Sequence, residues 1–359
     1  MKRILITGLL LLTCIIGFVL FGILIPAGIF KEIHPHFSGT VTKINLIEAA
    51  GPEDITIDQQ SGLAFISTDD RRINMQSRGS IEGKIFVMNL SDSIPSLQNV
   101  TPASITDFHP HGISLWTNPD GRKYLFVINH RQKNPANVIE RFEWRNDSLI
   151  HLESIQDENL MTSPNDVVAV GERSFYVTND HGYSTKGLGR TLEDFLQRSI
   201  SYVNYYDGTS FRKAASDIAY ANGINHSSDN SRIFVTSTTG RKVYIYDRSL
   251  ATGELILNQT IDTKTGVDNI ELDKTGSLWI GCHPQMLKFV AHAKDASKFS
   301  PSQVIKLSIN SNSEYEQEEI FLNDGSTYSG SSVAAVYKDK MLIGSVFEKS
   351  LLFCKLTDK

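Results

Sequence analysis

Residues 53–57, Glu-Asp-Ile-Thr-Ile, hold the pattern that decides the fold, because a polar pair leads straight into a short apolar strand. Five further segments begin in the same way. The six polar pairs are Glu53-Asp54, His111-Gly112, Asn165-Asp166, Asn222-Gly223, Asp268-Asn269 and Ser331-Ser332. Successive pairs lie 58, 54, 57, 46 and 63 residues apart. A unit that recurs at such a length indicates a repeat architecture.

Each unit then continues in a common way. A second strand-like run follows downstream of each pair, at residues 63–68, 124–130, 174–180, 232–238, 277–283 and 341–346. Turn-forming residues separate the two runs, and further short strand-like runs follow, such as residues 83–90 and 242–247. Four short strands in each of six units predict an all-β fold, a six-bladed β-propeller over residues 41–359.

The leading residues of the units also suggest a cation site. The innermost strand of a blade starts near the propeller axis, so these residues are expected to meet at the mouth of the central channel. Any one of them could simply cap a strand or form a local turn. As a set, however, inward polar groups are costly without a partner, and Ca²⁺ accepts several oxygen ligands. Carboxylate and amide oxygens suit calcium better than zinc or copper, so a central calcium tunnel is expected.

Histidines are expected near the same mouth. His111 leads the second unit and His130 ends the next strand, so the two rings can lie close together. A neutral imidazole there is a candidate general base, while a purely structural role is the alternative. Asp180, His181 and His283 end second strands and should face the same mouth. Cys282 is expected to be a buried, inert thiol.

One segment of the third unit is predicted to be a helix. Thr191 can cap it, and Leu192, Phe195, Leu196 and Ile200 have helical spacing. Such an insert would lie over the channel mouth as a lid or would pack as an ordinary loop.

Composition narrows the class of protein. Of the 359 residues, 40% are apolar and 21% are charged, so the chain can bury a core. The net charge of −5 gives no basic surface, so no nucleic-acid partner is expected. Three cysteines provide neither a disulfide framework nor a zinc-finger spacing. The sequence also lacks the G-x-S-x-G, P-loop and dinucleotide-binding motifs.

The amino terminus predicts a membrane segment. Residues 4–30 follow Lys2 and Arg3 and carry no charge. This uncharged run is long enough to cross a bilayer. The expected domains are a signal anchor over residues 1–30, a linker over 31–40 and the propeller over 41–359. The positive flank predicts a membrane-anchored protein with its propeller on the extracytoplasmic side, in a periplasm, a lumen or the extracellular space. If the segment is cleaved as a signal peptide, the propeller would be secreted.

Several motifs together resemble the serum paraoxonase/arylesterase family. They are GPEDITID (51–58), HPHGISLW (109–116), SPNDVVAVG (163–171), FYVTNDHGY (175–183), YANGIN (220–225), VDNIELD (267–273), LWIGCHP (278–284) and SSVAAVYKDKMLIGSVF (331–347). They occur in the family's order and spacing over roughly residues 45–355.

The resemblance implies a six-bladed propeller with two calcium ions. The catalytic calcium would be held by Glu53, Asn165, Asn222, Asp268 and Asn269. The structural calcium would be held by Asp54, Asp166 and the backbone carbonyl of Ile113. The resemblance also makes His111 and His130 a catalytic dyad and places Asp180, His181 and His283 around the substrate pocket.

The chain departs from the family in three places. The family's disulfide joins cysteines near the two ends of the propeller, and Cys354 matches one of them while Thr42 stands at the other. Ring closure should therefore rest on strand pairing. The segments 69–80 and 181–200 differ most from the family and should border the pocket, so substrate preference is the least transferable property.

The favoured function is a calcium-dependent hydrolase of small lactones and aryl esters. A water activated by the histidine dyad or by Glu53 would attack the carbonyl group that the cation polarises. The alternative is a membrane-tethered, calcium-stabilised propeller that binds a ligand without catalysis. A sugar lactonase with one divalent ion is a third reading, and the second carboxylate set, Asp54 and Asp166, speaks against it.

Overall fold

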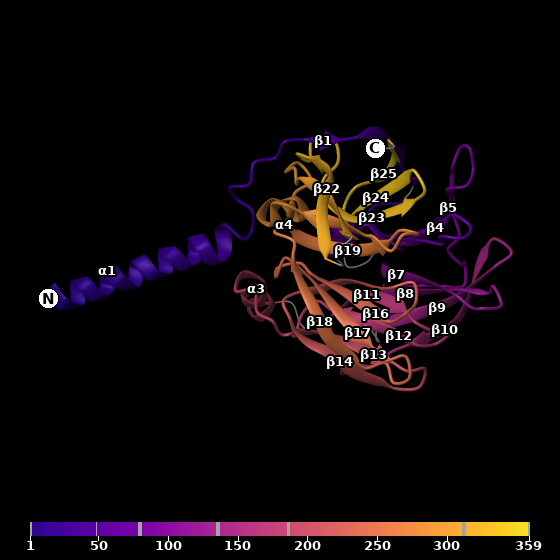
Figure 1. Ribbon diagram of the computed structural model, residues 1–359, viewed down its shortest axis with the longest axis horizontal. Helices are drawn as coiled ribbons and strands as arrows, with labels where there is room; N and C mark the ends of the chain where they lie inside the picture. The colour runs from indigo at the N-terminus through magenta and orange to yellow at the C-terminus, as the bar shows by residue number, and fades with distance from the viewer. Residues whose placement is uncertain are drawn as a thin grey trace.

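The computed structural model describes residues 2–47, 49–77, 81–133, 137–184, 187–310 and 314–357. Six antiparallel sheets surround a common axis, which confirms the predicted six-bladed propeller (Figure 1). The innermost strands are β3 (Pro52–Ile57), β7 (Pro110–Thr117), β11 (Pro164–Ala169), β15 (Ala221–His226), β19 (Gly266–Leu272) and β23 (Ser331–Tyr337). The second strands are β4 (Leu63–Thr68), β8 (Lys123–His130), β12 (Phe175–Asn179), β16 (Arg232–Ser237), β20 (Leu278–His283) and β24 (Lys340–Ser345).

Two outer layers complete the blades. The third strands are β5 (Lys84–Asn89), β9 (Asn137–Arg145), β13 (Ser201–Tyr206), β17 (Lys242–Arg248), β21 (Ser302–Ile309) and β25 (Ser350–Leu356). The outermost strands are β6 (Leu97–Asn99), β10 (Ser148–Ile155), β14 (Phe211–Ile218), β18 (Leu255–Asp262), β22 (Tyr315–Asn323) and β2 (Gly39–Asn45). A short strand, β1 (His36–Phe37), extends the fifth blade by pairing with β22.

The ring is closed by the two ends of the propeller. Strand β2 pairs with β25, so the amino-terminal strand completes the blade that holds the carboxy-terminal one. An apolar cluster that includes Leu46, Ile55, Val333 and Leu351 then packs this last blade against the first. Similar clusters lie between the other neighbouring blades and bury the apolar faces of the sheets.

Every innermost strand is irregular at its polar pair. The pairing with the second strand shifts between Pro52 and Asp54 in the first blade, and it shifts at the equivalent place in the other five. Such a bulge bends the strand and re-aims its side chains, which is why bulges are common beside active sites. The repeated polar pair therefore marks a repeated backbone feature at the mouth of the channel.

Three short helices follow second strands on this mouth. They are α2 (Arg71–Ser77), α3 (Leu188–Phe195) and α4 (Met286–Lys294). Because an innermost strand starts at the mouth and its antiparallel neighbour ends there, the segments after β4, β12 and β20 lie at the same end. The predicted helix exists as α3, but its predicted start was wrong. The helix begins at Leu188, and the Thr191 hydroxyl donates to the Gly187 carbonyl from inside the first turn.

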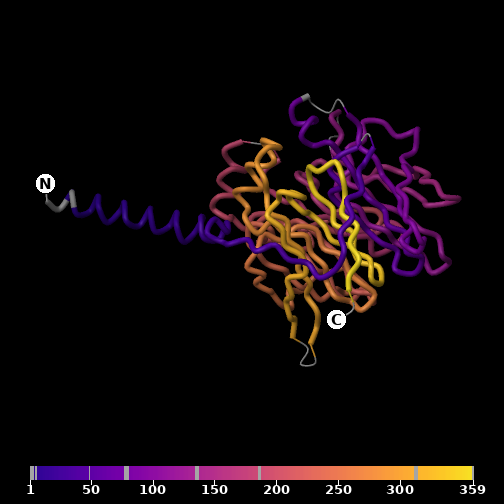
Figure 2. The backbone as a smooth tube through the Cα atoms, turned by 90° about the horizontal axis from the view of Figure 1, so that it is seen from above, coloured from indigo at the N-terminus to yellow at the C-terminus, as the bar shows by residue number. Residues whose placement is uncertain are grey.

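The amino-terminal segment forms a helix that leaves the propeller. Helix α1 (Lys2–Gly17) continues as a π-helix, η1 (Phe18–Leu24), and α1 projects away from the blades in both Figure 1 and Figure 2. Residues Ile6–Leu24 are apolar enough to cross a membrane, with a mean hydropathy of 2.6. A signal sequence has the same properties, so the helix fits either an anchor or a leader.

Candidate functional site

The polar pairs line a cavity at the channel mouth. Its volume is about 320 Å³, and its walls include Glu53, His111, Asn165, Asn222 and Asp268, each the first residue of a polar pair. Five of the six blades thus contribute the residue that the repeat singled out. The polar pair of the sixth blade is not among the described lining residues, but the Ser332 hydroxyl donates to the Glu53 carbonyl at 2.6 Å.

Four buried oxygens of this ring have no hydrogen-bond partner among the described residues. They are Glu53 Oε2, Asn165 Oδ1, Asn222 Oδ1 and Asn269 Oδ1. The amide nitrogens, in contrast, are held. Asn269 donates to Glu53 Oε1 at 2.9 Å, Asn222 to the Thr238 hydroxyl at 2.8 Å and Asn165 to Asp180 at 3.4 Å. Each amide is therefore fixed with its acceptor oxygen unused.

This donor set fits a hard cation. Unpaired buried oxygens are costly, and Ca²⁺ binds carboxylate and amide oxygens together. Among the described residues, no three histidine, cysteine, aspartate or glutamate side chains gather as a metal-binding group, so asparagine oxygens are needed to complete a ligand set. The fifth predicted ligand, Asp268, accepts a hydrogen bond from His283 Nε2 at 2.8 Å. The other carboxylate oxygen, Oδ1, makes no hydrogen bond or ion pair with the described residues.

Glu53 and Asp268 differ in their electrostatic surroundings. Burial alone would raise the pKa of Glu53, but His111, Arg71 and the Asn269 amide outweigh it and lower this pKa to about 2. Burial raises the pKa of Asp268, with His283 acting against the rise. Glu53 is therefore a permanent anion in the cavity wall.

Asp54 and Asp166 lie next to the ring and are buried. Asp54 accepts backbone N–H groups of Ile55 at 2.9 Å and Ile113 at 2.7 Å. Asp166 accepts those of Val167 and Ile224, each at 2.7 Å. Burial raises the pKa of both carboxyls, and the charges of Glu53 on Asp54 and of Asp54 on Asp166 raise them further.

The close approach of the blades explains two glycines of the polar pairs. A Cβ atom at Gly112 would lie 2.4 Å from Asp166 Oδ1, and one at Gly223 would lie 2.6 Å from the Asp268 carbonyl. Only glycine fits where a strand passes so near its neighbour. The predicted ligand Ile113 follows Gly112 and is placed beside Asp54 by its N–H group; the role of its carbonyl oxygen stays a prediction.

The two histidines form a connected chain that ends at Glu53. His111 Nδ1 lies 2.9 Å from His130 Nε2, and His111 Nε2 lies 3.5 Å from Glu53 Oε2. On the other side, His130 Nδ1 lies 2.9 Å from Asn137 Oδ1. The sequence placed the two rings together correctly, but it gave no sign of Asn137, which starts β9 outside the repeated motif.

The contacts of Asn137 fix the tautomers of both rings. Its Nδ2 donates to the Met161 carbonyl at 3.1 Å, so its Oδ1 must accept a proton from His130 Nδ1. Burial, together with the charge of His111, lowers the pKa of His130 to about 4, so His130 is neutral and its Nε2 is an acceptor. His111 Nδ1 must then donate, which leaves His111 Nε2 with a free lone pair when that ring is neutral.

The remaining wall residues have distinct places. Asp180 and His283 line the cavity, and the His283 ring stacks on Phe289 of α4 with centroids 3.7 Å apart. His181, which was predicted to line the pocket, is not among the described lining residues of this cavity. It lies between Asp180 at 2.7 Å and Asp194 of α3 at 3.2 Å and thereby ties α3 to the wall.

A second cavity adjoins the first. Its volume is about 450 Å³, and Arg71, His111 and Asp180 line both cavities. Arg71, which sequence reasoning missed, comes from α2. Its Nη2 lies 3.7 Å from Glu53 Oε2 and donates to the Pro110 carbonyl at 3.2 Å. An arginine in the variable 69–80 segment has no motif, so only the position of α2 reveals it.

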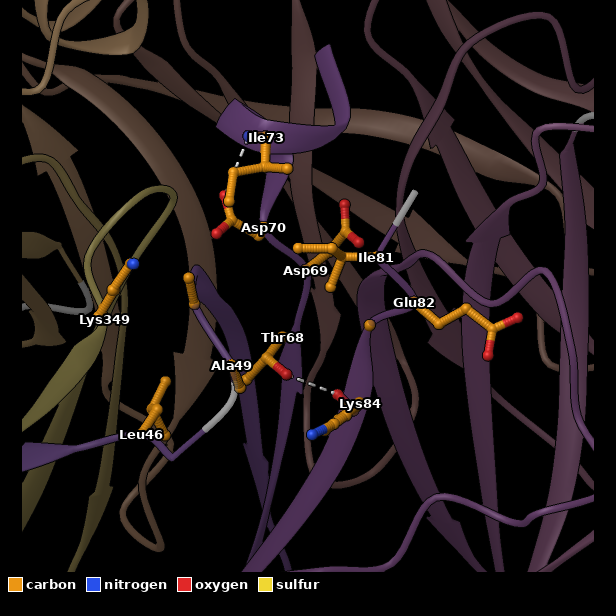
Figure 3. A pocket seen from close by; sticks show the side chains of 12 residues that line it. Leu46, Ala49, Thr68, Asp69, Asp70, Ile73, Ile81, Glu82, Lys84 and Lys349 are labelled. Carbon is orange, nitrogen blue, oxygen red and sulfur yellow. Dashed lines mark hydrogen bonds between the residues drawn. The ribbon is translucent and has the colours of Figure 1, made fainter. Parts of the chain in front are cut away.

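A third cavity shows how α2 is held. Figure 3 shows this pocket of about 300 Å³, lined by Thr68, Asp69, Asp70 and Lys349 among others. Asp70 accepts the Ile73 N–H at 3.1 Å and so caps the start of α2. Asp69 accepts a hydrogen bond from the Asn74 amide at 2.8 Å. The residues drawn in Figure 3 do not include those of the polar ring, so this cavity is distinct from the first.

Comparisons with known proteins show the family of the chain. The model of a protein family described as arylesterase matches residues 35–356. Serum paraoxonase/arylesterase 1 of Homo sapiens is 34% identical over 332 residues, 91% of each chain. Serum paraoxonase/lactonase 3 of Homo sapiens is 34% identical over 331 residues, 91% of each chain.

Among solved structures, a putative gluconolactonase shares the fold. Its TM-score is 0.54 at 13% identity, and the match covers 92% of this chain and 97% of that one. Identity at this level supports the propeller architecture alone. The match over residues 35–356 and the identity to the paraoxonases together show that this chain belongs to the arylesterase family.

Proposed function

We propose that the protein is a calcium-dependent hydrolase of lactones and aryl esters. Membership of the arylesterase family supports ester and lactone hydrolysis, and relatives bear both arylesterase and lactonase in their names. The observation that carries calcium dependence is the set of four unpaired buried oxygens, from Glu53, Asn165, Asn222 and Asn269. Together with Asp268 they are the predicted ligands of one ion. Calcium bound there would polarise a carbonyl group and stabilise negative charge on its oxygen.

A second ion is part of the proposal. The carboxyls of Asp54 and Asp166 are buried close enough for the charge of one to raise the pKa of the other. Without a cation such a pair would bind protons, and a cation relieves their repulsion. We assign Asp54, Asp166 and the Ile113 carbonyl to this structural ion, as the family resemblance implies.

The histidine chain supplies the base. With Asn137 and His130 fixing the tautomers, His111 Nε2 can accept a proton from a water molecule in the cavity. Glu53 is a weak base because it is one of the proposed ligands of the ion, and a carboxylate that binds a cation holds a proton poorly. His130 is a weak base because burial lowers its pKa to about 4. The geometry therefore favours His111 as the base and His130 as the residue that orients it.

The apolar part of the wall suits the organic part of an ester. Phe289, Val290, Val346 and Phe347 line the same cavity as the polar ring. In a lactone the leaving alcohol stays tethered to the acyl group, so one attack opens the ring. An aryl ester places its ring against the aromatic wall.

We also propose that α1 and η1 anchor the protein in a membrane with the propeller on the extracytoplasmic side. The end of this segment is held by the propeller. Gln197 donates to the Gly22 carbonyl at 2.9 Å, and the Met286 N–H donates to the Ala27 carbonyl at 3.0 Å. The anchor thus ends beside α3 and α4 at the cavity mouth. If the segment is cleaved, these contacts are lost and the propeller is secreted.

The test is a panel of phenyl acetate, γ-lactones and δ-lactones with the full-length protein in detergent. We expect turnover that excess chelator abolishes and added Ca²⁺ restores, and two bound ions by equilibrium dialysis. Glu53→Gln keeps the shape and removes the charge, so its calcium affinity should fall at least about tenfold and its kcat/KM about a hundredfold. Turnover that persists after proven calcium removal would refute the metal role. Tight calcium binding without any turnover would favour a binding module, and one ion per chain would favour a single-ion lactonase.

A further inference from the structure

The second cavity contains a cation that the proposed chemistry does not use. Arg71 lies at the wall shared by the two cavities, and its side chain is 13% exposed. Its recorded hydrogen bonds within the described chain come from Nη1 and Nη2 and go to the carbonyls of Gly51 and Pro110, at 3.4 and 3.2 Å. The nearest carboxylate oxygen is Glu53 Oε2 at 3.7 Å, which is an ion pair without a hydrogen bond, and these two hydrogen bonds use only two of the five N–H donors of the guanidinium.

Two carboxylates that line the same cavity, Asp69 and Asp180, are held by other partners. Asp69 accepts from His109 at 3.0 Å and from Asn74 at 2.8 Å. Asp180 accepts from His181 at 2.7 Å. Glu53 Oε2 lies 3.7 Å from Arg71 Nη2, so these residues form an ion pair without a hydrogen bond, while Glu53 Oε1 accepts from the Asn269 amide at 2.9 Å.

A second guanidinium lines the same cavity. Arg190 of α3 donates to the carbonyls of Tyr183 and Ser184, at 2.8 and 3.0 Å, which again leaves its charge without a close carboxylate. The third arginine of this cavity, Arg131, is paired with Glu140 at 2.7 Å. Arg71 and Arg190 thus place two guanidinium groups on the wall of this cavity, which also includes His111 and the carboxylates of Asp69 and Asp180.

We propose that this second cavity is a subsite for a carboxylate on the substrate, and that Arg71 is the residue that recognises it. The inference rests on the proposed function and names its substrate class: esters and lactones that carry an anionic carboxylate. A guanidinium group binds a carboxylate through two parallel hydrogen bonds. This interaction is strongest in a partly enclosed site. With His111 lining both cavities, an anionic group near Arg71 places the rest of the substrate next to the polar ring.

The experiment compares matched substrates that differ only in charge. The ester pair is 4-acetoxybenzoate and 4-acetoxybenzamide, and the lactone pair is γ-butyrolactone-γ-carboxylate and its amide. We expect the wild type to favour each carboxylate in kcat/KM. Arg71→Met should reduce this preference about 10–100-fold, as expected for the loss of a charge-assisted pair. Arg71→Lys should restore part of it, because lysine keeps the charge without the fork.

Arg72→Met is the matched control on the same helix. Arg72 donates to the His292 carbonyl at 2.9 Å and packs on Phe347, so it holds α2 against α4. Loosening α2 should change turnover of the acid and the amide alike and leave their ratio unchanged. If Arg71→Met lowers kcat/KM equally for the carboxylate and the amide, Arg71 only positions Glu53. That result would overturn the subsite.

The wild-type protein gives an independent readout. Inhibition of phenyl acetate hydrolysis by 4-hydroxybenzoate should be at least about tenfold stronger than by 4-hydroxybenzamide, and the difference should shrink with salt. Equal inhibition, with the neutral esters still hydrolysed, would overturn the subsite and leave the proposed function standing. If none of the esters and lactones is hydrolysed, the proposed function fails and the inference with it.

Discussion

At the scale of single residues, His130 keeps one tautomer because both of its ring nitrogens have partners. Asn137 accepts from Nδ1, and His111 donates to Nε2. This arrangement resembles the outer-shell hydrogen bonds that orient catalytic imidazoles. The position of the proton on His111 is thus decided by Asn137, which acts through two successive hydrogen bonds.

Asn137→Leu removes the acceptor without adding a charge. We expect kcat to fall about 10–100-fold with a much smaller change in KM, because His130 Nδ1–H loses its partner and His111 loses its orientation. The pH–rate profile of the variant should shift as well, which a loss of packing alone would not cause. Asn137→Asp, which keeps an acceptor, is the conservative control. An Asn137→Leu enzyme with the wild-type kcat and pH profile would contradict this role.

The residues that sequence predicted and those it missed differ in one respect. Glu53, Asn165 and Asp268 stand at equivalent places of a repeat, so each position supports the others. Arg71 and Asn137 lie outside the repeated pair and come from a helix and an outer strand. Their roles depend on which side chain the fold brings beside His111 and Glu53, and a single sequence does not contain that information.

At the scale of elements, α3 is held to the cavity wall by His181. The ring lies between Asp180 and Asp194, at 2.7 and 3.2 Å. Burial alone would lower the pKa of His181, but the hydrogen bonds and charges of these carboxylates outweigh it and raise it from 6.5 to about 9. Because this pKa is higher in the folded state than in the unfolded state, the protonated ring stabilises the fold. The stabilisation is complete at a pH below the pKa of the unfolded state, and it is lost as the pH rises through the pKa of the folded state.

His181→Asn should therefore destabilise the protein in a pH-dependent manner. The difference in unfolding free energy between wild type and variant should be about 1–3 kcal/mol at pH 6 and should nearly vanish at pH 10. Urea denaturation at pH 6, 8 and 10 measures it. Asp194→Asn removes only the α3 partner and should give a smaller loss with the same trend. A difference that stays constant from pH 6 to 10 would show that the ion pairs are not the cause.

The helices show where sequence patterns stop being informative. A helix was predicted from the spacing of residues 191–200, but α3 covers Leu188–Phe195, so it begins four residues before the start that a Thr191 cap predicts and ends before Ile200. The helices α2 and α4 were not predicted at all. They have seven and nine residues, close to the eight of α3, but neither segment offers a capping residue followed by helical spacing that would mark it in the sequence.

At the scale of the whole molecule, the ring is closed by strand pairing between β2 and β25. All seven residues of β2 are paired, and apolar side chains of the first and last blades pack beside them. The sequence correctly predicted closure without a disulfide at Thr42, since Cys354 is free. The register, however, pairs Thr42 with Phe353 and Val41 with Cys354. In this chain the residue directly opposite Cys354 is therefore Val41, and such a register follows from strand pairing that a motif match does not reveal.

Val41→Cys should restore a covalent closure. Directly opposed residues of antiparallel strands have Cα atoms about 4.5–5.5 Å apart, which lies within the range of disulfides. Because the bond would join the two ends of the propeller, it should restrict the unfolded chain strongly and stabilise the fold by about 1–3 kcal/mol. Thermal melts with and without reductant, and mass spectrometry of the unreduced protein, measure this.

Thr42→Cys lies one residue out of register, so its side chain points to the opposite face of the sheet. It should stay reduced and show no reductant-dependent melting temperature. If instead Thr42→Cys cross-links and Val41→Cys does not, the register that closes the propeller is wrong.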